Sequence, residues 1–349
     1  MEPIEIDGRK IGKDYPPYII AELSANHNGD LQKALDTISM AKECGANAIK
    51  LQTYTPDTMT IDCDKEQFLI KGGLWDGYKL YDLYLQAQTP FEWHKILFSH
   101  ARDIGLTCFS TPFDETAVDL LEEFDVPAYK IASFEAIDLP LIRYIASKKR
   151  PIILSTGMAD LPEIEEAVAA VRESGCDKLI LLHCISSYPT PLEQSNLLTI
   201  PDMREHFNVQ VGLSDHTTNN VAAITSVALG ATVIEKHFIL SRHEKGPDSE
   251  FSVEPGELKA LCRQTRDAWL ALGEAGYDRK PAEEDNIKFR RSIYFVQDLS
   301  AGETITAQHI RRIRPGFGLP PKFFDQLIGK VVKQDVERGT ATQWDLIYE

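Results

Sequence analysis

Short apolar runs alternate along most of the chain with segments that have the spacing of amphipathic helices. The runs are bounded by polar residues or glycine, and they cover residues 18–24, 48–54, 106–113, 128–133, 151–157, 179–186, 209–217 and 233–240. Helix-forming segments such as 31–44, 115–123 and 163–174 lie between them. Alternation of strands with helices favours parallel pairing. Eight such units predict an α/β fold of the (β/α)8 (TIM) barrel type, which usually takes ~250 residues.

Two segments interrupt or precede this rhythm. Residues 55–105 separate the second and third predicted strands and include a stretch rich in glycine and aromatic residues at 71–77. Connections of that length are usually functional, so we expect a loop that covers or binds something. Residues 4–11 alternate around Asp7-Gly8, which is typical of a hairpin. We expect this hairpin to close the N-terminal end of the barrel.

The composition changes after the last predicted barrel helix. Charged residues and turn formers dominate residues 273–286, as in a linker. We therefore expect a barrel domain with its hairpin over residues 1–275, a linker over 276–286 and a small, mostly β domain over 287–349.

Composition and charge narrow the classes of partner. Hydrophobic residues at 43% and charged residues at 26% exclude a disordered or fibrous chain. The net charge of −16 repels phosphate backbones and anionic lipids, so neither nucleic acid nor membrane is an expected partner. The first residues lack a basic segment followed by an apolar one, which predicts a cytoplasmic protein. Six cysteines occur without a C-x-x-C pair, which indicates structural thiols.

Polar residues lie within or just beyond the C-terminal ends of the predicted strands. They are Glu22, Lys50, Gln52, Ser110, Thr111, Lys130, Ser133, Ser155, Ser186, Ser214, Asp215, His216, Glu235 and His237. Barrels of this type carry their chemistry at these ends. Because side chains alternate across a strand, Lys50 shares a face with Gln52. We expect a polar site in the barrel mouth, and the alternative is a set of core ion pairs that join Glu22 or Glu235 to Lys50 or Lys130.

The types of polar side chain indicate the chemistry. Lysines and hydroxyl groups at the rim of an acidic chain indicate an anionic substrate with a phosphate or carboxylate, clamped by Lys50 and Lys130. His216 and His237 follow neighbouring strands and could hold one divalent ion together with water and substrate oxygens, as in a catalytic site. A packed structural histidine is the alternative for both. It is the preferred interpretation of His94, His100, His183 and His206.

Several segments together resemble one known family. They are Ala21-Glu-Leu-Ser-Ala-Asn-His-Asn-Gly29, Lys50-Leu-Gln-Thr53, Phe109-Ser-Thr-Pro-Phe113, Tyr129-Lys-Ile-Ala-Ser133, Leu154-Ser-Thr-Gly-Met158, Gly212-Leu-Ser-Asp-His-Thr217, Glu235-Lys-His-Phe238, Gly246-Pro-Asp248 and Arg314-Pro-Gly-Phe-Gly318. In this order, over essentially the whole chain, they are similar to the sialic acid synthase family. That resemblance implies a (β/α)8 barrel followed by an antifreeze-like (SAF) domain, in a domain-swapped homodimer. It also implies a transferase that condenses phosphoenolpyruvate with an N-acylated amino sugar, using Mn²⁺ or possible substitutes Mg²⁺ and Co²⁺.

The resemblance also assigns residues by motif. It assigns phosphoenolpyruvate to Lys50, Thr111, Lys130, Ser133, Ser155 and Ser214. It assigns the sugar to Gln52, Tyr188, Asp248 and Arg314, with Arg314 supplied by the partner chain. It assigns the metal to His216 and His237, and it places Glu22, Lys50, Lys130 and His237 among the catalytic groups, with Glu22 near the water and the enol carbon.

Other segments narrow the comparison within the family. Residues 54–60, 71–77, 135–140 and 289–294 resemble pseudaminic acid synthases more than N-acetylneuraminate synthases. This implies 2,4-diacetamido-2,4,6-trideoxy-L-altrose as the acceptor. N-acetylneuraminate or legionaminic acid synthesis is the near alternative, and a metal-dependent pyruvate aldolase is a more distant one. A non-enzymatic surface-binding module is the alternative of a different class, and phosphate release from phosphoenolpyruvate would exclude it.

Overall fold

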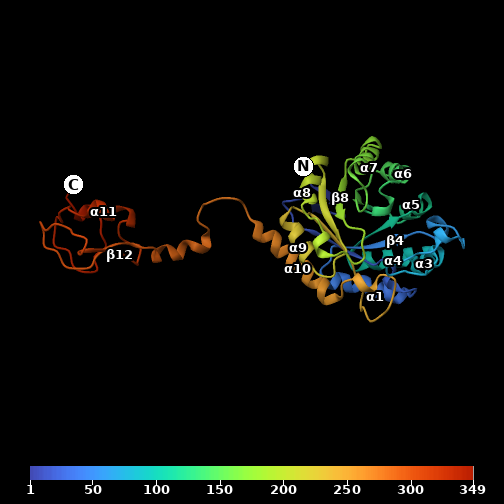
Figure 1. Cartoon of the computed structure of the whole chain (residues 1–349), viewed down its shortest axis with the longest axis horizontal. Coiled ribbons are helices and arrows are strands. Elements are labelled where there is room, and N and C mark those ends of the chain that lie inside the picture. The colour runs from blue at the N-terminus through green and yellow to red at the C-terminus, as the bar shows by residue number, and fades with distance from the viewer. Residues whose placement is uncertain (349) are drawn as a thin grey trace. The chain divides into compact units, whose positions relative to one another are not determined.

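Eight parallel strands close into a barrel in the order β10-β3-β4-β5-β6-β7-β8-β9, which confirms the predicted (β/α)8 architecture (Figure 1). The computed structural model describes residues 1–348, and the chain divides into two units after Gly273. The barrel strands are β3 (Tyr18–Glu22), β4 (Ala48–Thr53), β5 (Thr107–Pro112), β6 (Tyr129–Ile131), β7 (Ile152–Ser155), β8 (Leu179–Cys184), β9 (Gln210–Asp215) and β10 (Val233–His237). Each lies inside one of the eight predicted apolar runs.

Helices surround the barrel and bury their apolar faces against the outside of the strands. They are α1 (Leu31–Cys44), α4 (Phe91–Asp103), α5 (Glu115–Glu122), α6 (Leu139–Ser147), α7 (Leu161–Glu173), α8 (Thr199–Phe207), α9 (Val221–Ala228) and α10 (Pro255–Leu272). Helix α1 shows how local sequence sets these bounds: the Asp30 side chain accepts from two backbone amides at its start, and Gly45 ends it at φ 93°. None of the helices among residues 1–348 is long and apolar enough to span a membrane.

The segment between β4 and β5 is only partly irregular. Its last part is α4, the helix that packs on the outside of the barrel between these two strands. The first part carries α2 (Pro56–Met59), the 3₁₀ turn η2 (Glu66–Phe68) and α3 (Leu80–Ala87). The expected covering loop is therefore residues 54–90, which contain short helices of their own.

The N-terminal hairpin closes the end of the barrel opposite to the polar rim. Strands β1 (Ile4–Ile6) and β2 (Arg9–Ile11) pair antiparallel around Asp7-Gly8, as predicted. Ile6 and Ile11 are buried in one cluster with inward-facing residues of the barrel strands, such as Ile20 and Phe109. The barrel interior is thus apolar at this end, which leaves the C-terminal strand ends for the site.

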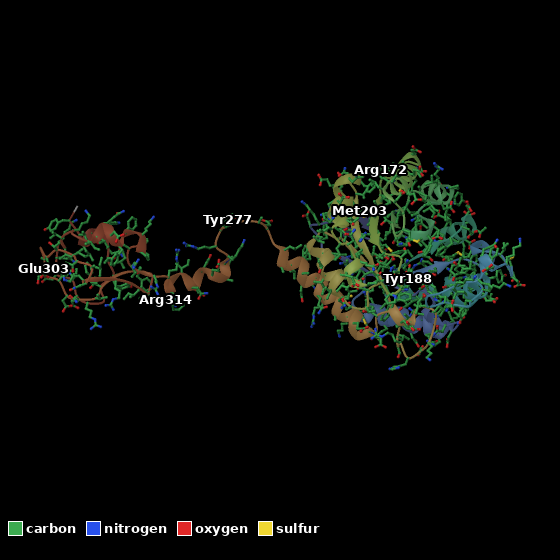
Figure 2. All side chains as sticks on the ribbon, in the orientation of Figure 1. Arg172, Tyr188, Met203, Tyr277, Glu303 and Arg314 are labelled. Atoms are coloured by element: carbon green, nitrogen blue, oxygen red, sulfur yellow. The ribbon has the colours of Figure 1, made fainter. Side chains whose placement is uncertain are left out.

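The second unit has its own small core. Strands β11 (Ser292–Phe295) and β12 (Ile310–Ile313) pair antiparallel, followed by η7 (Pro321–Phe323), α11 (Phe324–Leu327) and η8 (Trp344–Leu346). Part of the segment expected as linker is helical, because η6 covers Pro281–Phe289. Proline at the start and two acidic residues in the first turn favour a helix there. Tyr277, in the remaining irregular stretch, is fully exposed (Figure 2).

Candidate active site

A cavity of about 380 Å³ opens at the C-terminal ends of the barrel strands. Most of the predicted site residues line it: Lys50, Gln52, Lys130, Ser133, Ser155, Tyr188, Ser214, His216, His237 and Asp248. Three do not. Glu22 lies below the cavity, Thr111 is buried on β5 with a hydroxyl group that has no hydrogen-bond partner, and Arg314 belongs to the second unit (Figure 2).

Buried ion pairs form the floor of the cavity. The Lys50 ammonium lies 2.7 Å from a Glu22 carboxylate oxygen and 3.4 Å from one of Glu235. The Lys130 ammonium lies 3.8 Å from the other Glu235 oxygen. The core ion pairs considered as an alternative are therefore present, and Lys50, Lys130 and Glu235 also face the cavity. The same residues therefore form both the core ion pairs and the polar site in the barrel mouth.

Burial and charge shift the titration of these groups. Burial lowers the pKa of Lys50 to about 7; Glu235 opposes this shift and Lys130 adds to it. Burial acts to raise the pKa of Glu235, but Lys130 and Lys50 outweigh it and hold that pKa below its usual range. Lys50 therefore changes charge near neutral pH, whereas Glu235 stays ionised.

Hydroxyl groups continue the polar floor. Lys130 donates to the Ser155 hydroxyl at 2.7 Å, and Ser214 donates to Glu235 at 3.1 Å. Ser133 is hydrogen-bonded to Ser186 at 2.8 Å. Ammonium and hydroxyl donors from separate strands thus converge on one small volume, which is the donor set that an oxyanion requires.

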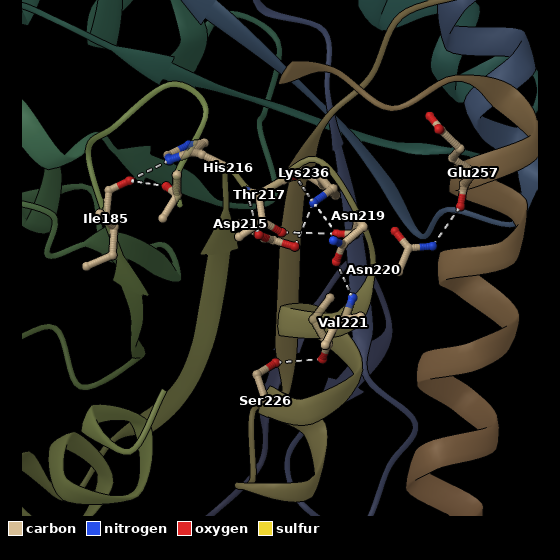
Figure 3. Close-up of polar contacts among 12 residues, drawn as sticks. Ile185, Asp215, His216, Thr217, Asn219, Asn220, Val221, Ser226, Lys236 and Glu257 are labelled. Atoms are coloured by element: carbon tan, nitrogen blue, oxygen red, sulfur yellow. Dashed lines mark hydrogen bonds and ion pairs between the residues drawn. The ribbon is translucent and has the colours of Figure 1, made fainter. Parts of the chain in front are cut away.

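The two predicted histidine ligands lie side by side, with ring centroids 5.5 Å apart. His216 Nδ1 is 2.9 Å from the Ile185 carbonyl oxygen, so Nδ1 is the donor (Figure 3). Burial acts to lower the pKa of His216, but Cys184 outweighs it and holds that pKa above its usual range, so Nε2 offers a lone pair to a metal only once the ring has lost its proton. Burial lowers the pKa of His237 well below its usual range, and neighbouring His216 and Lys50 add to this, so the ring is neutral. His237 Nδ1 is buried without a hydrogen-bond partner.

These features test whether the pair fits a divalent ion. Neutral imidazoles with an unshared ring nitrogen are the form that binds metals. No group of three or more His, Cys, Asp and Glu residues with metal-binding geometry occurs in residues 1–348. The pair therefore fits only an open site, in which water and substrate oxygens complete the coordination shell.

Aromatic and carboxylate groups form one side of the cavity. The Tyr188 ring lies 4.3 Å from His216 and 5.0 Å from Phe251, measured between centroids. Asp248 accepts a hydrogen bond from the Ser24 hydroxyl at 2.5 Å, and Gln52 donates to the same hydroxyl at 2.9 Å. Burial raises the pKa of Asp248, with Ser24 opposing the shift.

An apolar wall forms the other side and comes from residues 54–90. Its members are Tyr54, Met59, Ile70, Trp75, Leu80, Leu83, Tyr84 and Ala87. The Trp75 indole donates to the Pro247 carbonyl at 3.0 Å, which ties this segment to the loop that carries Asp248.

Sequence reasoning did not assign roles to several residues that line the cavity. Glu235 was among the polar residues at the strand ends. Glu135 begins the segment 135–140 and Trp75 lies in the segment 71–77, and both segments resemble those of pseudaminic acid synthases. No sequence signal marks Phe251. Burial raises the pKa of Glu135 to about 7, and one of its carboxyl oxygens has no hydrogen-bond partner.

Arg314 lies beside β12 in the second unit. It lines a hollow with Arg291, Arg311 and Arg312. The other residues that line this hollow are Ala307, Ile310, Ile313 and Phe324, so among residues 274–348 its charged lining is made of arginines.

These features define a class of (β/α)8 enzyme site. The cationic floor suits an anionic substrate, and the apolar wall suits a second substrate that is partly apolar. The two histidines face the same cavity. Residues 37–277 match the NeuB family, and residues 290–347 match the SAF domain. The chain therefore belongs to the NeuB family, which confirms the predicted membership and the predicted C-terminal domain.

Similar proteins of known name agree with this assignment. The chain is 47% identical over 328 residues to the pseudaminic acid synthase of Campylobacter jejuni subsp. jejuni serotype O:23/36 (strain 81-176), covering 94% of this chain and 96% of that protein. It is 42% identical over 331 residues to the pseudaminic acid synthase of Helicobacter pylori (strain ATCC 700392 / 26695), covering 95% and 97%. The N-acetylneuraminic acid (sialic acid) synthetase of Leptospira borgpetersenii serovar Hardjo-bovis superposes with a TM-score of 0.74 at 32% identity, covering 82% of this chain and 95% of that one.

The pKa of Lys50 leads to a pH prediction. Because the ammonium loses its proton above about pH 7, binding of phosphoenolpyruvate, used as an anionic probe, should weaken about tenfold between about pH 7.5 and 8.5. Isothermal titration calorimetry measures this. Lys50→Met should bind weakly at every pH in that range, without the same slope. Equal affinity of the unaltered protein at both pH values would contradict the role of Lys50.

Proposed function

We propose that this chain condenses phosphoenolpyruvate with 2,4-diacetamido-2,4,6-trideoxy-L-altrose and water to give pseudaminic acid and inorganic phosphate. The observation that carries the proposal is near full-length similarity, at 47% and 42% identity, to two pseudaminic acid synthases. The cavity supports it independently, because it joins a cationic floor to an apolar wall.

The floor would hold phosphoenolpyruvate. Lys50, Lys130 and the hydroxyl groups of Ser133, Ser155 and Ser214 supply charge-assisted hydrogen bonds to phosphate and carboxylate oxygens. Thr111 pairs with Gln52 in the barrel but is not part of the cavity lining, and its buried hydroxyl has no hydrogen-bond partner, so a direct contact with phosphoenolpyruvate would need that side chain to turn toward the cavity. As the carbon–oxygen bond to phosphate breaks, the two ammonium groups stabilise the negative charge that develops.

The mouth of the cavity would hold the sugar. Gln52, Tyr188 and Asp248 offer polar contacts, and the wall of residues 54–90 offers apolar ones. A 6-deoxy sugar with two acetamido groups presents three methyl groups, whereas N-acetylmannosamine presents one. The wall therefore supports a 6-deoxy diacetamido acceptor over N-acetylmannosamine, because a hydroxyl group buried against it would be left unpaired.

A divalent cation held by His216 and His237, with Mn²⁺ as the proposed ion and Mg²⁺ or Co²⁺ as substitutes, would polarise the open-chain aldehyde. Side chains of the protein would position the reacting groups and transfer protons. Glu22 holds Lys50 and Gln52 in place by direct contacts at 2.7 and 3.1 Å, so its effect on the enol carbon is transmitted through them. Glu135, with a pKa near 7, is suited to transfer a proton to or from water at C2.

The second unit would complete the site of a partner chain in a domain-swapped homodimer. Phe134 and Ile137, beside the cavity, expose 56% and 61% of their surface, and Phe317, near Arg314, exposes 63%. Exposed apolar side chains on both units support a contact that buries them. In that contact Arg314 would meet the acylamino carbonyl of the sugar.

A panel of acceptors tests the proposed sugar. With phosphoenolpyruvate present, kcat/KM for the diacetamido-trideoxy-altrose should exceed that for N-acetylmannosamine by at least about tenfold. Mass spectrometry identifies the products, and a legionaminic acid precursor serves as the third substrate. Ile70→Asn should lower the ratio of the two kcat/KM values. Leu69→Asn, at an exposed neighbouring position outside the wall, should leave that ratio unchanged. Equal or better kcat/KM with N-acetylmannosamine would refute the proposed acceptor.

Removal of metal tests the histidine pair. Chelation should abolish phosphate release, and Mn²⁺, Co²⁺ or Mg²⁺ should restore it. His216→Ala and His237→Ala should each lower kcat by more than about 100-fold while circular dichroism shows an unchanged fold. Full activity after exhaustive chelation is the result that would exclude a metal role.

Subunit mixing tests the role of Arg314 in trans. Arg314→Ala and His237→Ala should each be nearly inactive alone. Random reassortment makes half of the dimers mixed, and each mixed dimer contains one intact site, so activity should recover to about a quarter of the unaltered level. Mixtures that are verified as heterodimers but stay inactive would show that Arg314 acts within its own chain or not at all.

A further inference from the structure

Lys236 lies between two cavity residues, yet it points to the opposite face of β10. Glu235 and His237 line the cavity, whereas Lys236 does not. Its side chain is entirely inaccessible, at 0% exposure, on the helix-facing side of the barrel. An ammonium group that deep requires an explanation, because a buried charge is very unfavourable unless it is fully matched.

The ammonium of Lys236 is matched by three oxygens, one from the last residue of β9 and two from the loop that follows it. It donates to the Asp215 carboxylate at 2.6 Å, to the Thr217 carbonyl at 2.7 Å and to the Asn219 carbonyl at 3.0 Å (Figure 3). These are all the donors that a lysine has. Asp215 also accepts from the Thr217 amide at 2.9 Å, so the carboxylate and the ammonium hold the same turn.

His216 lies within this turn. Asp215 and Lys236 are register partners on adjacent strands, and both face outward, so Ser214 and His216 are turned inward. On the inner side, the Ile185 carbonyl fixes His216 Nδ1, and the His216 carbonyl accepts from the Thr190 amide at 2.9 Å. The residue is therefore held from the cavity side by the loop after β8 and from the helix side by Lys236.

We propose that Lys236 is a positioning residue for His216, acting through the 215–219 turn rather than by contact with substrate. This inference rests on the proposed function only for the part that His216 plays in turnover. A contribution to stability alone does not account for the ion pair, because a buried pair replaced by apolar groups is often neutral or stabilising. What an apolar pair could not do is bind the two backbone carbonyls that fix the turn.

The test uses a double variant, Lys236→Met with Asp215→Asn, in the full-length protein. The double change removes both charges together, so no unpaired buried ion remains, and the asparagine oxygen can still accept from the Thr217 amide. Ile234→Ala is the matched control: it lies on the same face of the same strand, is fully buried, and lowers stability without touching the turn.

Hydrogen exchange measured by mass spectrometry, without substrate or metal, tests positioning directly. Amides of residues 186–190 and 216–221 should exchange at least tenfold faster in the double variant than in Ile234→Ala, at temperatures equally far below each variant's midpoint of thermal unfolding. Equal exchange in the two variants would overturn the proposal, whether or not the proposed activity is correct.

Kinetics then separates positioning from general damage. In the double variant kcat should fall at least tenfold while the KM for phosphoenolpyruvate changes less than twofold, because the floor of the cavity is untouched. Ile234→Ala should keep both constants. If the double variant keeps the kcat of Ile234→Ala, Lys236 does not position His216 for turnover. If the unaltered protein shows no turnover, the proposed function fails and the exchange result still decides the positioning.

Discussion

Charge matching inside the barrel is the constraint on which the rest of the site depends. Lys50 lies between Glu22 and Glu235, and Lys130 reaches Glu235 from the other side. These residues come from β3, β4, β6 and β10, so the ions meet only when the sheet closes between β10 and β3. An unmatched ion at this depth would be very unfavourable. Closure of the barrel and assembly of the cavity floor are therefore one event.

Strands β3, β7 and β10 each pass from an apolar to a polar environment over two residues. Ile20 is followed by Glu22 on the inner face, Ile153 by Ser155, and Val233 by Glu235. The apolar members pack with the N-terminal hairpin, and the polar members form or support the floor. One pattern of alternation thus gives the barrel a closed, stable end and a reactive end.

Much of this arrangement follows from local rules and could be predicted. The apolar runs and their order predicted all eight strands, and nine of the fourteen polar residues at the strand ends line the cavity. Residues 281–286, the first part of the helix at Pro281–Phe289, were expected as linker, because charged residues and turn formers suit an exposed helix as well as a coil.

Other parts depend on contacts that no local pattern encodes. Trp75 meets Pro247 across 172 positions of sequence. Glu135 reaches the cavity from the turn η3 (Ser133–Glu135), whose direction is fixed by packing. Lys50 approaches Glu22 more closely than Glu235, at 2.7 Å against 3.4 Å, and this difference likewise depends on tertiary geometry.

Strand β10 carries functional or buried charged side chains on both faces, with Glu235 and His237 on the inner face and Lys236 on the outer one, so both faces fix its register. A shift by one residue would turn Lys236 into the cavity and move Glu235 and His237 among the helices, because successive side chains alternate. Insertions or deletions within residues 233–237 should therefore be incompatible with a folded barrel, whereas a change of length in the loops on either side leaves the register of this strand intact.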